Sequence, residues 1–215
     1  MRGSTYFLAV LLFVFPAVFF LPDYQVRAQD EGKDLLPTAN LYKPDEIREG
    51  FDRQEITPFD DPKFSFEVPI PKDWDSRRIE TSEKERKEAE AGEAMARMAV
   101  FSSKSHDEKN VTIEIYFMRV PTRVQLSDWM DTAIANTDSR VLARQAGEYI
   151  GREVEDVLLA REGDVPLFTR FTASRRGEYI FVVSGTSPKD QYPKYSRIFG
   201  LAALAFHPLG SEHTP

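Results

Sequence analysis

Residues 153–184 read EVEDVLLAREGDVPLFTRFTASRRGEYIFVVS, and this stretch decides the fold. It contains three runs with the composition of strands, at 153–161, 167–175 and 178–184. The breaks between them are short, and residues 175–178 have the sequence of a hairpin turn. A parallel crossover needs a dozen or more residues, so strands joined by such short turns are predicted to pair antiparallel.

Further strands are predicted on the N-terminal side of this stretch, at 145–150, 111–120 and 98–102. The clearest alternation lies at 64–70, where four apolar residues, Phe64, Phe66, Val68 and Ile70, are separated by Ser65, Glu67 and Pro69. The pattern has the period of two that is typical of a strand with one buried face. The domain is therefore predicted to open with a strand.

Two helices are predicted to pack on this sheet. The first ends near Asn136 and has apolar residues at helical spacing, namely Leu126, Trp129, Met130, Ala133 and Ile134. Ser187 is predicted to cap a helical turn, and the main closing helix is predicted to restart at Pro193, because an internal proline breaks the hydrogen-bond ladder. The charged segment 80–97 is interpreted as a solvated helix or mobile excursion, with an acid-rich docking surface as the alternative.

The opening strand 64–69 before Trp74, and the closing segment that ends in Ala205-Phe206, resemble the PsbP and DcrB superfamily. The resemblance covers residues 64–208. It implies an α+β fold, an α/β/α sandwich around a central, mainly antiparallel sheet. Members of the superfamily act mainly as assembly or docking factors without established catalysis, and the resemblance implies the same class of function for this chain.

The composition excludes several classes of protein. The chain has 215 residues with 41% hydrophobic content, which is sufficient for a folded core. Its 28 Lys and Arg against 35 Asp and Glu give a net charge of −7, so a nucleic-acid partner is not expected. No cysteine is present, which excludes disulfides, thiolate metal sites and thiol nucleophiles.

The N-terminal residues have the order of a secretory signal. Arg2 precedes an apolar run at 6–21, and Val26 and Ala28 occupy the small-residue positions of a signal peptidase site. Residues 1–28 are therefore predicted to be a signal peptide cleaved after Ala28, which places the mature protein in the periplasm or outside the cell. The alternative is an uncleaved membrane anchor, although the run is shorter than the roughly 20 residues that span a bilayer core.

Residues 29–62 are predicted to be a flexible, proline-containing leader before a domain at 63–208, with residues 209–215 as a tail. In this interpretation, deletion of residues 29–57 leaves the melting temperature of the domain nearly unchanged. The alternative is a docking arm that binds a partner through its apolar residues, Leu41, Tyr42, Ile47 and Phe51.

No pattern in the chain predicts a catalytic residue, a cofactor or a metal site. The one local group of histidine and carboxylates, at 106–108, has too few convergent ligands for a useful metal site. Residues 183–187 do not match the nucleophile elbow G-x-S-x-G. The carboxylate pairs Asp128/Asp131 and Glu153/Glu155 would need burial to serve in acid–base chemistry.

Arginines gather at Arg170, Arg175 and Arg176, and a surface edge of this kind can pair with carboxylates of a partner. The alternative is that these arginines only solvate the edge and deter strand addition.

The sequence thus predicts an exported, non-catalytic docking or assembly module of a bacterial envelope that binds a protein partner. The alternative is a ligand-binding carrier or an enzyme with a pocket between the sheet and the helix at 126–136. A deep concavity lined by Tyr116, Met118 and buried carboxylates would favour this alternative.

Overall fold

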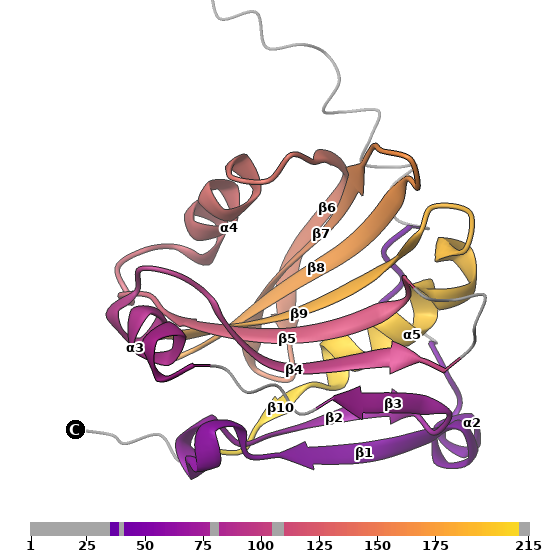
Figure 1. The fold of residues 1–215 in the computed structure, drawn as a ribbon, viewed down its shortest axis with the longest axis horizontal. Coiled ribbons are helices and arrows are strands. Elements are labelled where there is room, and N and C mark those ends of the chain that lie inside the picture. The colour runs from indigo at the N-terminus through magenta and orange to yellow at the C-terminus, as the bar shows by residue number, and fades with distance from the viewer. Residues whose placement is uncertain (1–34, 39–40, 78–81, 105–109, 211–215) are drawn as a thin grey trace, which may run out of the picture.

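The computed structural model describes residues 35–38, 41–77, 82–104 and 110–210. Its largest element is a seven-stranded antiparallel sheet in the order β3-β4-β5-β9-β8-β7-β6 (Figure 1). The strands are β3 (Trp74–Arg77), β4 (Ala96–Ser103), β5 (Thr112–Arg119), β6 (Arg140–Tyr149), β7 (Arg152–Arg161), β8 (Leu167–Arg176) and β9 (Tyr179–Pro188). The antiparallel pairing predicted from the short turns is confirmed, since β6 to β9 form consecutive hairpins.

One face of this sheet is covered by the closing helix α5 (Tyr192–Ala205) and by a small sheet of β1 (Phe51–Ile56), β2 (Phe66–Pro71) and β10 (His207–Pro208). Large aromatic side chains fill the layer between them, among them Phe66, Phe117 and Phe199. The packing is close. A Cβ atom at Gly185 of β9 would lie 2.3 Å from Cγ of Phe199, so glycine is required where α5 approaches the sheet.

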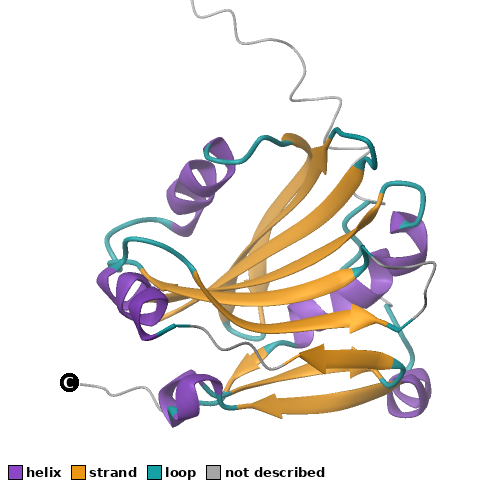
Figure 2. Ribbon diagram, in the orientation of Figure 1, coloured by secondary structure: helices purple, strands orange, loops and turns teal. Residues whose placement is uncertain are grey.

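The opposite face carries helix α4 (Leu126–Ala135), which packs on the second core cluster, whereas helix α3 (Glu83–Ala91) inserts Ala89 into the main core and pairs Arg86 with Asp61. Helix α3 contacts β4 and β5, and α4 contacts β7 and β8. Figure 2 shows the two helices set apart from each other. Because they lie over different strands, the face of the sheet is only partly covered.

The helices at residues 83–91 and 192–205 bear on two of the predictions. The charged segment does contain a helix, α3, which begins with a capping box between Ser82 and Glu85, so the solvated-helix interpretation holds for residues 83–91. The predicted cap at Ser187 is wrong. Ser187 lies in β9, where it pairs with Phe168, and the closing helix begins at Tyr192. Strand β9 pairs with β8 as far as Pro188, whereas the sequence pattern predicted that this strand ends at Ser184.

The prediction of a flexible leader is wrong for residues 41–62, which form part of the fold. They include helix α2 (Pro44–Gly50), strand β1 and the short 3-10 helix η1 (Pro58–Asp60), and a second 3-10 helix, η2 (Pro62–Phe64), continues from them. Strand β1 pairs along its whole length with β2, from Phe51 opposite Pro71 to Ile56 opposite Phe66. The stabilisation comes from this non-local ladder and not from an apolar period within the segment, which is why the sequence pattern did not indicate it.

The predicted signal peptide at 1–28, residues 29–34 of the predicted leader and residues 211–215 of the predicted tail lie outside the described residues. Within the part of the chain that the structure describes, no helix has the length and apolar character needed to cross a membrane.

Candidate functional site

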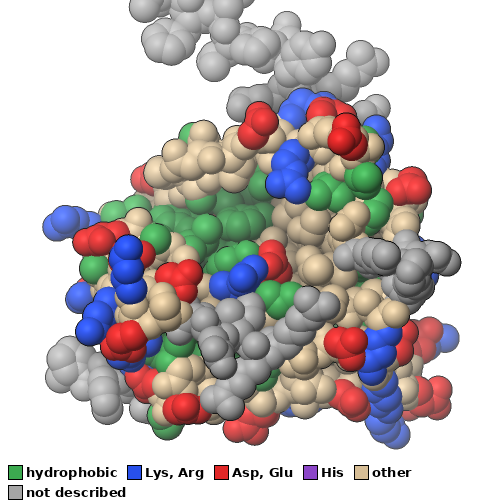
Figure 3. Space-filling model, viewed as in Figure 1, with side chains coloured by type: hydrophobic (Ala, Val, Ile, Leu, Met, Phe, Trp, Pro, Cys, Tyr) green, Lys and Arg blue, Asp and Glu red, His purple; other side chains and the backbone are tan. Residues whose placement is uncertain are grey.

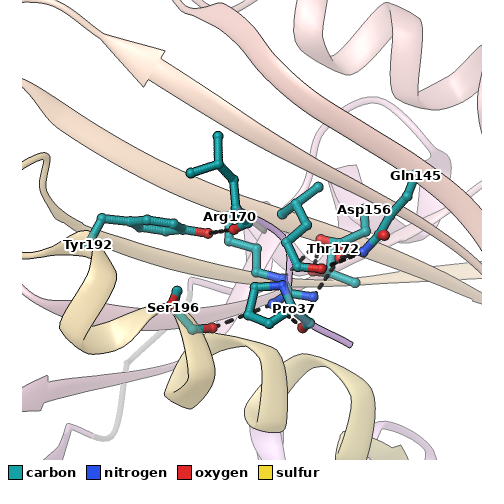
Figure 4. A network of polar contacts seen from close by, with 9 residues as sticks. Pro37, Gln145, Asp156, Arg170, Thr172, Tyr192 and Ser196 are labelled. Atoms are coloured by element: carbon teal, nitrogen blue, oxygen red, sulfur yellow. Dashed lines mark hydrogen bonds and ion pairs between the residues drawn. The ribbon is translucent and has the colours of Figure 1, made fainter. Parts of the chain in front are cut away.

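The predicted partner-binding arginine Arg170 is buried, with only 1% of its side chain exposed. Its Nε and Nη2 donate to the two carboxylate oxygens of Asp156, at 3.1 and 2.6 Å (Figure 4). Thr172 Oγ1 and Gln145 Nε2 donate to the same carboxylate, at 2.8 and 2.9 Å. Arg170 is thus a structural residue and not part of a surface edge, because its charge is neutralised and enclosed within the fold.

The same buried network holds the segment at residues 35–38. Three consecutive main-chain carbonyls of this segment accept hydrogen bonds: Leu35 from Tyr192 (2.8 Å), Leu36 from Gln145 (3.1 Å) and Pro37 from Arg170 (2.9 Å). The side chain of Leu36 is 2% exposed and belongs to the main core. Burial also raises the pKa of the Tyr192 phenol above its usual value. The polar contacts therefore fix the beginning of the described chain to the sheet.

The other two predicted arginines lie on opposite faces of β8, since neighbouring residues of a strand alternate. Arg175 donates to the carbonyls of Val120 and Val124, at 3.3 and 2.6 Å. Arg176 donates to the carbonyl of Pro208. The structure does not bring Arg170, Arg175 and Arg176 together into one basic surface.

The apolar residues predicted to form a docking arm contact the rest of the domain. Leu41 is 9% exposed and packs with Leu201 and Leu204 of α5. Tyr42 and Phe51 pack edge to face, with ring centroids 4.9 Å apart. Tyr42, Ile47 and Phe51 are all partly buried against the same small cluster. The surface available to a partner from these residues is therefore smaller than the sequence suggested.

A more open apolar surface lies on the sheet face between α3 and α4. Six partly buried side chains pack over the second core cluster: Tyr116, Met118, Val124, Ala133, Ile134 and Phe171. We refer to these six side chains as the open face. They stand above fully buried residues of the sheet such as Val157 and Val182, and Phe171 stacks on Trp129 with ring centroids 6.5 Å apart. Figure 3 shows hydrophobic side chains gathered in a hollow on this side of the molecule.

A hydrogen-bonded polar group accompanies the open face. Arg97 of β4 lies opposite Tyr116 of β5, and its Nη1 donates to Oε1 of Glu114 at 2.8 Å. The Tyr116 hydroxyl donates to the other oxygen of Glu114, at 2.9 Å. Burial and the neighbouring Glu114 carboxylate raise the pKa of Tyr116, so the phenol remains a hydrogen-bond donor. An apolar surface with a few fixed polar groups is typical of recognition sites.

The predicted carboxylate pairs have structural roles. Glu155 is 5% exposed, and its carboxylate accepts from Arg144 Nε at 3.0 Å. Arg144 also pairs with Asp131, so this arginine links α4 to the sheet. Asp128 is exposed near the start of α4, where a carboxylate favours the helix dipole. None of these pairs has the geometry of an acid–base couple.

The structure offers no metal centre among the described residues, since no three or more His, Asp or Glu side chains converge there. The group at 106–108 lies outside the described residues. His207 is exposed on β10.

Comparisons with known proteins find similar folds but no similar sequence. No family model and no curated protein sequence matches this chain. The solution structure of cyanobacterial PsbP (CyanoP) from Synechocystis sp. PCC 6803 matches with a TM-score of 0.51 and 13% identity, over 74% of this chain and 92% of that one. The chain has a PsbP-like fold. The resemblance stated from the sequence is thus confirmed for the fold.

A second PsbP-like structure is LpqN of Mycobacterium tuberculosis, described as involved in cell envelope biogenesis. It matches with a TM-score of 0.50 and 9% identity, over 77% of this chain and 96% of LpqN. At these identities, both likenesses concern the arrangement of the backbone.

Sequence reasoning identified part of the open face and missed the rest. A deep concavity lined by Tyr116 and Met118 was named as the sign of the alternative function, and the structure packs both residues, partly buried, against the second core cluster. Arg97, Glu114 and Phe171 were missed. The available signal was the mixed polar and apolar face of β5, which is unusual for a face that is either fully solvated or fully buried.

Proposed function

We propose that this protein is an exported, non-catalytic docking module whose open face binds a protein partner. The observation that carries the proposal is the apolar sheet surface left between α3 and α4. On the other side of the sheet, α5 and the small sheet complete the layer, whereas here aromatic and aliphatic side chains remain partly exposed. Exposed apolar patches bordered by polar groups are typical of interaction sites.

The chemistry of the surface limits what the partner presents. Arg97 and Glu114 neutralise each other, and Tyr116 is held by Glu114, so no unbalanced charge is available in this polar group to attract a charged ligand. A partner segment with apolar side chains, such as one face of an amphipathic helix, complements the open face. A helix placed there would also complete the helical layer on this side of the sheet.

Site-specific photo-cross-linking of the full chain in its own cells tests this proposal. A photoreactive phenylalanine at position 171 or 118 is expected to give one discrete protein adduct, which Ile134→Glu abolishes. The matched control places the same group at Asp52, an exposed residue of β1 on the other side of the molecule. Identical adducts at position 52, or no protein adduct at positions 171 and 118, would contradict the docking proposal.

The same hollow supports a second candidate function, an apolar-ligand carrier. The observation in its favour is that the partly buried Tyr116 and Met118 pack on an apolar cluster, and that the Tyr116 hydroxyl is held by Glu114 beside them. The cross-linking experiment separates the two functions, because a carrier yields adducts with the added mass of a small lipid-like molecule instead of a protein.

Export is a separate part of the proposal and needs its own test. N-terminal sequencing of the protein from cells is expected to begin at Gln29 if the predicted signal is cleaved. A protein that retains residues 6–21 and partitions with membranes would instead be held at the membrane surface by its N-terminal segment.

A further inference from the structure

Strand β6 forms one border of the seven-stranded sheet, because among the described strands it pairs only with β7 (Figure 1). A register shift between Val141 and Ala143 interrupts this pairing, and the regular stretch runs from Ala143 to Tyr149. The last four residues of this stretch are all exposed. An exposed strand at the border of a sheet presents main-chain groups that can pair with another chain.

The turn after β6 determines which main-chain groups point outward. Ile150 and Gly151 both have positive φ, 50° and 70°, as in the type I′ turn of a two-residue hairpin. Tyr149 is therefore hydrogen-bonded to the first residue of β7. Such pairs alternate along an antiparallel ladder, so the N–H and C=O groups of Ala146 and Glu148 point away from β7. Within the described ranges no other main-chain group bonds to them, and they are available to an added strand.

A hollow of about 240 Å³ lies beside this border of the sheet. Two buried aliphatic residues, Val154 and Leu204, form part of its wall. Gly147 also lines it, and a Cβ atom at this position would have no other atom within 4 Å. The polar side chains that line it, Gln145 and Asp156, are hydrogen-bonded to each other at 2.9 Å. The hollow is smaller than the roughly 300–1,000 Å³ of small-molecule sites, so it suits a single aliphatic side chain.

The other side of the same border carries unbalanced negative charge. Glu148 lies opposite Glu153 of β7, and opposite residues of a strand pair share one face of the sheet. Like charges in this arrangement are unfavourable. Arg175 approaches Glu153 at 3.9 Å, whereas Glu148 has no ion pair with any described residue. A basic side chain placed beside Glu148 would offset the repulsion.

We propose that β6 binds an extended segment of a protein partner, which adds a strand to the sheet and presents an aliphatic residue next to a basic one. Neighbouring residues of a strand point to opposite faces. An aliphatic side chain opposite Gly147 therefore enters the hollow, while a basic side chain opposite Glu148 lies beside that carboxylate. In this mode of recognition the main-chain hydrogen bonds provide affinity, and the two side chains provide specificity.

Fluorescence anisotropy of the full chain with labelled peptides tests the proposal. One peptide consists of threonine and valine with leucine-lysine at its centre, and the second has glutamate in place of the lysine. The wild type is expected to bind the lysine peptide saturably and about fivefold more tightly than the glutamate peptide, because opposite charges then face each other across the strand pair. Glu148→Lys is expected to reverse this preference.

Gly147→Val tests the hollow. It is expected to weaken binding of the lysine peptide at least about tenfold, since the added side chain occupies the space that the leucine needs. Its melting temperature should match that of the wild type, and if this variant does not fold, the charge reversal by Glu148→Lys still tests the site. The matched controls are Gly163→Val and Glu162→Lys, at exposed positions between β7 and β8, and both should bind like the wild type.

The proposal is overturned if the wild type binds neither peptide, if both peptides bind equally, or if folded Gly147→Val binds as tightly as the wild type. Two other occupants of the border would overturn it as well. A dimer in analytical ultracentrifugation that Gly147→Val dissociates would assign the border to a second copy of the chain. Peptide binding that appears only after removal of residues 29–34 would assign it to the chain's own N-terminal segment. None of these outcomes bears on the open face, because none of its six side chains lines the hollow.

Discussion

Arg170→Met is expected to destabilise the fold strongly, because it leaves the Asp156 carboxylate buried without its counter-charge. In the structure, four donors converge on Asp156, and the substitution removes the two from Arg170, at 3.1 and 2.6 Å. It also removes the donor to the Pro37 carbonyl, at 2.9 Å. Breaking one side of a buried ion pair costs about 3–5 kcal/mol. For a domain of this size, a loss of about 4 kcal/mol lowers the melting temperature by roughly 8–16 °C.

Urea unfolding followed by circular dichroism measures this loss, and two variants serve as controls. Arg53→Met removes an arginine whose side chain is 75% exposed, so it should cost less than about 1 kcal/mol. The double variant Arg170→Met with Asp156→Leu should recover part of the loss, since no unpaired charge then remains in the core. The reasoning is refuted if Arg170→Met costs no more than Arg53→Met, or if the double variant is no more stable than Arg170→Met alone.

Three further predictions concern the packing and the titratable groups. Gly185→Ala should destabilise the fold by about 1–3 kcal/mol because its Cβ would overlap Phe199, whereas Gly147→Ala, with no atom within 4 Å, should be near neutral in the same urea assay. Deleting residues 29–57 should lower the free energy of unfolding by at least about 3–6 kcal/mol, because the burial of Leu36 and Leu41 is lost. An unchanged melting temperature would show that the segment is only a leader. The pKa of Tyr192 is raised in the folded protein, so its contribution to the free energy of unfolding is present below pH 10 and is lost as the pH rises above 10, where the phenol of the unfolded chain ionises. In urea unfolding at pH 10 to 12, Tyr192→Phe should lose less stability with rising pH than the wild type. An equal loss with pH in both proteins would contradict this prediction.

The sequence by itself determined the parts of the fold that depend on local pattern. The turns between β7, β8 and β9 are too short for parallel crossovers, so antiparallel pairing followed without further information. Helix α4 was likewise determined by the spacing of its apolar residues, because the period of 3.6 places Leu126, Trp129 and Met130 on one buried face. The overall PsbP-like arrangement followed from the order of these elements.

Only the tertiary structure decided where the polar and irregular residues lie. Arg170 has the sequence context of a surface strand. Its burial depends on Asp156, which the β7–β8 hairpin places diagonally across from it, and on the carbonyl of Pro37 far away in the chain. The segment at 35–62 has no period of its own, because its stability comes from the ladder with β2 and from Leu36 in the core. Long-range contacts of this kind leave no signal in local composition, because neither of the two contacting residues has a distinctive sequence pattern around it.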